Sequence, residues 1–121
     1  MAVSVADLIK RKEAREASKK ARYDIKTSMG VFTIRKPSRA IFIESRDMEN
    51  GDGDRYVILN SVVEPNLKDA KLQEAYECTE PTDIIDKLFD PGEVVSIAKA
   101  IMEVCGYGKD IPKKVHEDLK N

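Results

Sequence analysis

Residues 90–106 read DPGEVVSIAKAIMEVCG and carry the strongest helix signals in the chain. Asp90 suits the N-cap, Pro91 the first helical position, and Glu93 the third position, where its carboxylate completes a capping box. Gly106 is the residue type that most often ends a helix. The stretch therefore predicts an amphipathic helix with a core-facing side that consists of Val94, Ile97, Ala98, Ile101, Met102 and Cys105.

The segments upstream predict further helices separated by turns. Thr82 suits the N-cap of a helix that runs through Phe89, and residues 66–76 predict a short helix or an irregular turn. Pro37 stops a strand, and the serine after it caps a helix that reaches about Met48. Residues 50–54 read NGDGD and predict a flexible loop. The apolar face of the helix before Phe89 is expected to hold Ile84, Ile85, Leu88 and Phe89.

Residues 55–63 read RYVILNSVV, an apolar stretch that periodicity leaves open between helix and strand. Helix is favoured, because four apolar residues in it share one wide helical face. Pro65 then ends the helix. The four residues are Ile58, Leu59, Val62 and Val63.

Residues 23–36 alternate polar and apolar side chains around Met29-Gly30, which is typical of a β-hairpin. A loop at Met29-Gly30 predicts that Thr27 faces Phe32 and that Ile25 faces Ile34. One face of the hairpin is then apolar and the other is polar, as expected for a sheet with one solvated face. The members of the apolar face are Tyr23, Ile25, Thr27, Phe32 and Ile34.

With 121 residues, the chain is expected to build one core. The fold class is α+β, mostly α: a compact helical domain with one N-terminal β-hairpin. We divide the chain into a basic N-terminal helix (1–22), a single globular domain (23–107) and a polar C-terminal tail (108–121). The first helix starts with an N-cap at Ser4 and has only a short apolar stripe, made of Val5, Leu8 and Ile9.

The net charge of −1 hides a strong division along the chain. Residues 1–40 hold 11 Lys and Arg against 4 Asp and Glu, a net of +7, so residues 41–121 carry −8. Such asymmetry indicates a surface for a charged partner. Acidic residues interrupt the basic run and no aromatic is interleaved, which disfavours nucleic acid and favours a solvated helix face. The predicted partner-binding residues are Lys10, Arg11, Arg15 and Lys19.

The residues needed for catalysis or metal binding are sparse. His116 is the one histidine and is expected to be exposed, and the two cysteines, Cys78 and Cys105, are expected to be small buried side chains. No glycine-rich phosphate loop is present, and the acids of residues 50–54 lack the calcium-loop spacing. We therefore predict no catalytic residues, no metal ligands and no cofactor. No apolar run is long enough to cross a membrane, and no signal peptide is apparent.

Three motifs in order resemble the XkdN-like tail assembly chaperones of tailed phages and prophage elements. They are VVEPNL at 62–67, EPTDIIDKLF at 80–89, and PGE at 91–93 followed by a helix that ends at Gly106. The resemblance runs from about Asp24 to Tyr107. It implies a protein without enzymatic activity in the bacterial host cytoplasm, absent from the mature virion. It also implies two partners, the tape measure protein, which the chaperone keeps soluble, and the tail tube protein, which it helps to recruit.

Self-association along the tape measure protein is a further expectation, because the two charged parts of the chain attract each other between copies. Two other functions stay open. One is a minor structural or completion protein of the tail. The other is a small nucleic-acid-binding module that uses the basic N-terminal helix.

Overall fold

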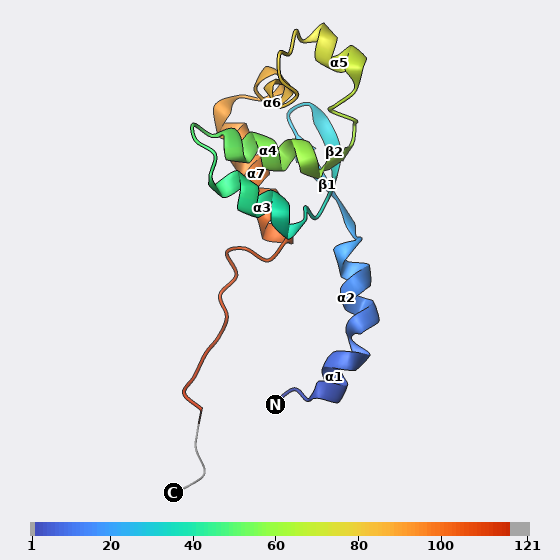
Figure 1. Cartoon of the computed structure of the whole chain (residues 1–121), viewed down its shortest axis with the longest axis vertical. Coiled ribbons are helices and arrows are strands. Elements are labelled where there is room, and N and C mark those ends of the chain that lie inside the picture. Colours follow the sequence, from blue (N-terminus) through green and yellow to red (C-terminus); the bar gives the residue numbers. More distant parts are fainter. Residues whose placement is uncertain (1, 117–121) are drawn as a thin grey trace, which may run out of the picture.

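The computed structural model describes residues 2–116, which form seven helices and three strands (Figure 1). The chain is mostly helical with a small antiparallel sheet, so the predicted fold class is confirmed. In order, the elements are α1 (Val5–Lys10), α2 (Lys12–Lys19), β1 (Arg22–Thr27), β2 (Gly30–Arg35), α3 (Arg39–Arg46), α4 (Asp52–Ser61), β3 (Val62–Glu64), α5 (Ala70–Ala75), α6 (Asp83–Leu88) and α7 (Pro91–Val104).

The core lies where α4 and α7 pack together, with α3, α6 and the sheet around them. Of the six residues of α7 and its end that were predicted to face inward, four are buried, while Met102 and Cys105 are half-buried. Each buried isoleucine removes apolar surface from water, which is the main favourable contribution to folding. The isoleucines with no exposed surface are Ile34, Ile58, Ile84, Ile85 and Ile101.

Both predicted ends of α7 are confirmed, but the predicted capping box is wrong. Asp90 is the N-cap and makes no side-chain cap bond. At the other end, the N–H of Gly106 donates to the carbonyl of Glu103 and the N–H of Tyr107 donates to that of Met102. These two bonds form a Schellman motif, for which Gly106 supplies a φ of +95°.

Glu93 binds the hairpin turn in place of the helix terminus. Its carboxylate accepts hydrogen bonds from the backbone N–H of Ser28 (2.7 Å) and from the hydroxyl of Ser28 (2.5 Å). Tertiary contact therefore supplies two donors that the sequence pattern around Asp90 does not reveal. The pair fastens the hairpin turn to the start of α7.

We expect Glu93→Ala to lower the free energy of unfolding by about 1–2 kcal/mol, because two hydrogen bonds to a carboxylate are lost. Urea denaturation measures this, with Glu103→Ala on the exposed side of the same helix as the control. A double-mutant cycle with Ser28→Ala isolates the hydroxyl bond. A coupling energy near zero would contradict the contact.

The hairpin forms, but its predicted loop is wrong. The loop is Ser28-Met29, and Thr27 pairs with Gly30, Ile25 with Phe32, and so on to Arg22 with Arg35. The hydroxyl of Thr27 accepts from the N–H of Met29 and donates to the carbonyl of Gly30 (2.8 Å), which favours this turn. The register differs by two residues from the prediction. Since strand side chains alternate with a period of two, every residue keeps its predicted face.

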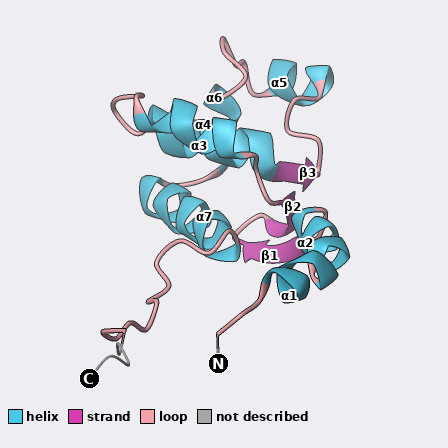
Figure 2. Cartoon of the chain, turned by 60° about the horizontal axis from the view of Figure 1, so that its bottom comes forward, coloured by secondary structure: helices cyan, strands magenta, loops and turns pink. Residues whose placement is uncertain are grey.

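The helix predicted for residues 55–63 is confirmed as far as Ser61 and wrong for the last two residues. Val62 and Val63 belong to β3, which pairs antiparallel with β2 through Ile34↔Val62 and Thr33↔Glu64. Figure 2 shows β3 continuing directly from the end of α4. The free edge of β2 offers backbone partners that a helical turn here would leave unpaired. The sheet therefore has three strands in the order β1-β2-β3, in place of a lone hairpin.

Several helix boundaries in the structure differ from the predicted ones. The loop predicted for residues 50–54 is wrong from Asp52 on, because α4 starts there after Gly51 in a left-handed conformation. The helix expected to reach about Met48 ends at Arg46. The single helix predicted for residues 1–22 is divided at Arg11 into α1 and α2, and its final residue opens β1. The division into three parts stays a prediction, and residues 117–121 of the predicted tail lie outside the described residues.

Candidate functional site

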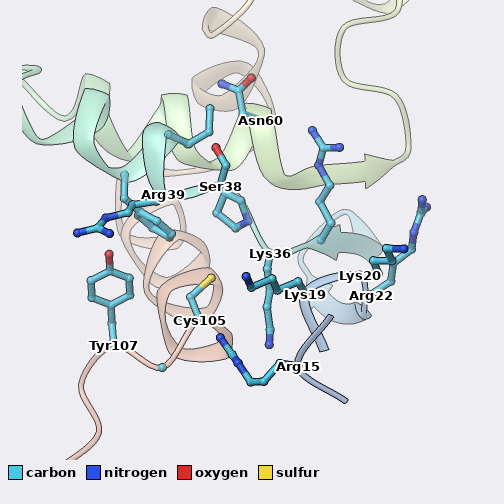
Figure 3. A pocket seen from close by; sticks show the side chains of 15 residues that line it. Arg15, Lys19, Lys20, Arg22, Lys36, Ser38, Arg39, Asn60, Cys105 and Tyr107 are labelled. Carbon is cyan, nitrogen blue, oxygen red and sulfur yellow. The ribbon is translucent and has the colours of Figure 1, made fainter. Parts of the chain in front are cut away.

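A groove of about 1080 Å³ lies between α2 and the body of the protein (Figure 3). Seven of its lining residues are Lys or Arg, and no Asp or Glu lines it. We call it the basic groove. Its cations are Arg15, Lys19, Lys20, Arg22, Arg35, Lys36 and Arg39; its other lining residues are Pro37, Ser38, Ile41, Phe42, Asn60, Cys105, Gly106 and Tyr107.

Three local features of the sequence bring these cations together. Arg15 and Lys19 are four residues apart on α2 and so share one helical face. The hairpin register places Arg22 directly across from Arg35. The chain then turns at a buried proline between β2 and α3, which sets Lys36 and Arg39 on either side of the turn.

The groove cations have no carboxylate partner within the part of the chain that the structure describes. The two ion pairs found there both involve Arg55, with Asp52 and with Asp86, each at 2.7 Å. The hydrogen bond to Asp86 is the main reason that the pKa of Arg55 is raised. Like charges gathered without counter-charges repel one another, so an anionic partner would stabilise the groove.

Lys36 links the groove to α2. Its ammonium donates a hydrogen bond to the hydroxyl of Ser18 (2.9 Å) and lies 5.9 Å from the centre of the Tyr23 ring. The bond to Ser18 joins α2 to the residue that follows β2, on the side where Arg15 and Lys19 line the groove.

One wall of the groove is apolar and aromatic. The rings of Phe42 and Tyr107 lie 4.9 Å apart, and Tyr107 is 47% exposed. Figure 3 shows Arg39 beside Tyr107, with Cys105 between this wall and the cations of α2. Burial raises the pKa of the Cys105 thiol, which therefore stays neutral near pH 7. Both cysteines pack against the core but are half-buried, so they are less buried than predicted.

The four predicted partner-binding residues separate into two pairs. Arg15 and Lys19 line the groove, whereas Lys10 and Arg11 do not. The contribution of residues 35–39, RKPSR, was not predicted, since these residues were assigned only to a strand end and a helix start. The aromatic wall was not predicted either, because Phe42 and Tyr107 reach the groove only through the tertiary fold.

The N-terminal arm, made of α1 and α2, extends from the body (Figure 1) and contains no buried residue. Its first helix begins at the predicted N-cap, Ser4, which forms a capping box with Asp7, and the backbone N–H of Ser4 lowers the pKa of Asp7. The apolar stripe predicted on this helix is exposed to solvent. Val5 is 74% exposed, Leu8 58% and Ile9 67%.

Other polar groups in the described residues have structural roles. The carboxylate of Asp83 accepts from the backbone N–H groups of Glu80 and Thr79, which lowers its pKa. The Tyr56 hydroxyl donates to Glu44, which raises the pKa of Tyr56. Within residues 2–116, no three His, Cys, Asp or Glu side chains gather as metal ligands would. In the same range, no helix is both long and apolar enough to span a bilayer.

The chain was compared with known families, curated proteins and solved structures. The model of a family described as phage XkdN-like tail assembly chaperone protein matches residues 9–120, nearly the whole chain. No curated protein matches the chain. No solved structure matches it either.

Proposed function

Because the chain belongs to the phage XkdN-like tail assembly chaperone family, we propose that it binds the tape measure protein during tail morphogenesis. The bound chaperone keeps the tape measure soluble and helps to recruit tail tube subunits. The family match over residues 9–120 is the observation that carries this proposal. We propose that the protein acts by binding alone, without catalysis, in the host cytoplasm, and that it leaves before the virion is complete.

The N-terminal arm supports this function. A long helical chain exposes apolar stripes until partners cover them, and a helix with its own exposed apolar stripe can pack against such a chain. Val5, Leu8 and Ile9 form such a stripe on α1. Lys10 and Arg11 follow the stripe directly and would contact acidic side chains that flank the partner's apolar face.

Co-expression with the tape measure protein of the same tail operon tests the proposal. We expect the tape measure to be soluble only when this chain is present. The double substitution Leu8→Asp and Ile9→Asp should reduce the soluble fraction at least about tenfold, because two aliphatic contacts are replaced by charges. The matched control is Ile111→Asp with Val115→Asp, two exposed aliphatics outside the arm.

The outcomes test the proposed function and the proposed contact surface of the arm separately. A tape measure that stays insoluble with the wild-type chain would overturn the proposed function. Equal solubility with both double variants would leave the function standing and remove the arm from the contact. The folded state of the arm variant should match the wild type by circular dichroism, since Leu8 and Ile9 contribute nothing to the core.

The basic groove favours one alternative function, nucleic acid binding. Seven cations beside an exposed tyrosine match the charge and stacking that single strands require. A gel shift at low and moderate salt tests it, because phosphate contacts weaken steeply as salt rises. A minor structural role in the tail is tested by mass spectrometry of purified particles, in which a chaperone should be absent.

We also propose that copies associate with one another along the tape measure. The charge division of the chain, +7 before residue 41 and −8 after it, supports contact between unlike parts of neighbouring copies. In this proposal the four basic residues predicted from the sequence are partner contacts, two beside the apolar stripe and two in the basic groove.

A further inference from the structure

We infer that the basic groove of one copy receives the acidic end of a second copy, formed by α5, α6 and the turns around them, so that copies join head to tail. The inference deepens the proposed self-association. It rests on the proposed function only in placing the row of joined copies on the tape measure protein. Both sides of the proposed contact are surfaces of this chain.

The acidic end carries a net negative charge, opposite to that of the groove. Residues 65–90, which contain α5, α6 and the turns around them, hold seven Asp and Glu against three Lys, a net of −4. Glu74, Glu77 and Glu80 are exposed, and their carboxylates form no hydrogen bond or ion pair with any described residue. These side chains are therefore available to a cationic surface.

No ion pair joins the two charged surfaces within one copy among the described residues. Figure 1 shows α5 and α6 at one end of the long axis and the N-terminal arm at the other. Helix α7 connects the two regions, with Asp90 at its start and the groove residue Cys105 at its end. Its 14 residues rise about 21 Å in total, at 1.5 Å each.

That separation exceeds the distance over which exposed charges interact at physiological salt, about 8 Å. The groove therefore keeps its charge in the isolated copy, and a second copy can neutralise it. A contact between two different surfaces at opposite ends is heterologous. When the rotation between neighbouring copies does not close a ring, repeating the contact produces an open row. Copies joined this way form a row whose length grows with concentration.

Sedimentation of the full chain at increasing concentration tests the contact. We expect the wild type to self-associate at low salt and the association to weaken as salt is added. The groove variant, Arg15→Glu with Lys19→Glu, should weaken association at least about tenfold. The end variant, Glu74→Lys with Glu77→Lys, should weaken it to a similar extent.

Mixing the two variants gives the decisive measurement. The groove variant keeps the acidic end of the wild type, and the end variant keeps the wild-type groove, so one native contact can form between the two variants. The mixture should therefore sediment faster than either variant alone. The matched control is Arg46→Glu with Lys99→Glu, which changes the charge by the same amount at two exposed cations outside the groove and the acidic end, and it should associate like the wild type.

A wild type that stays monomeric at low salt would overturn the inference, as would a mixture that sediments no faster than its components. If the protein shifts single-stranded RNA in a gel while it stays monomeric, the groove is a nucleic-acid site and the inference is overturned. Sedimentation uses this chain alone. Its result is therefore independent of whether the chain keeps a tape measure protein soluble, and either proposal can fail while the other stands.

Discussion

Ile101→Ala is expected to lower the free energy of unfolding by about 3–4 kcal/mol. Ile101 has no exposed surface and lies on the inner side of α7, within the core that joins the helices to the sheet. The substitution removes three carbon atoms and leaves a cavity that the surrounding helices fill only in part. The helix itself is not weakened, since alanine has the highest helix propensity.

Urea denaturation followed by circular dichroism measures this loss, and the thermal midpoint should fall by about 15 °C for a domain of this size. Val95→Ala is the matched control, because Val95 lies on the same helix and is 58% exposed. It should change stability by less than about 0.5 kcal/mol. Equal losses at the two positions would mean that α7 does not bury the side predicted from its sequence.

Gly53→Ala is expected to destabilise the protein by about 2–3 kcal/mol, although alanine normally strengthens a helix. Gly53 lies in the first turn of α4, where a Cβ atom would stand 2.5 Å from the backbone carbonyl oxygen of Ser45 in α3. A backbone atom in a packed helix cannot move aside as a flexible side chain can. Accommodating the methyl group therefore requires α3 and α4 to separate, which weakens contacts with the buried Phe42.

Gly92→Ala is the matched control for this substitution. Gly92 also lies in the first turn of a helix, and an added Cβ atom there meets nothing within 4 Å. Stability should rise by about 0.5 kcal/mol through helix propensity alone. Chemical denaturation of both variants compares them, and two changes of the same sign would contradict a close approach of α3 and α4.

The fold class and the faces of the elements could be predicted from local patterns. The start, the inner residues and the glycine stop of α7 follow from helix chemistry that operates within a few residues. The hairpin faces were also predicted, because a two-residue error in register leaves strand faces unchanged. The end of α4 could not be predicted, since Val62 and Val63 suit either a helix or a strand until β2 supplies a partner.

The candidate site was predicted less completely. The basic run of the first 22 residues indicated a charged partner surface, and Arg15 and Lys19 do line the groove. The cations of residues 35–39 and the aromatic wall were missed, because they come from segments far apart in the chain. The role of Glu93 was missed for the same reason, since Ser28 lies 65 residues away from it.

Short-range chemistry in the chain was thus enough to establish a mostly helical protein with an N-terminal hairpin, and the division between a basic first third and an acidic remainder. Capping, turn formation and side-chain periodicity act over a few residues and can be recognised without a structure. Folding added the third strand, the close contact at Gly53, the bond from Glu93 to the hairpin, and the meeting of seven cations in one groove. These features depend on which distant segments lie side by side, and that choice is made by burial of the shared core.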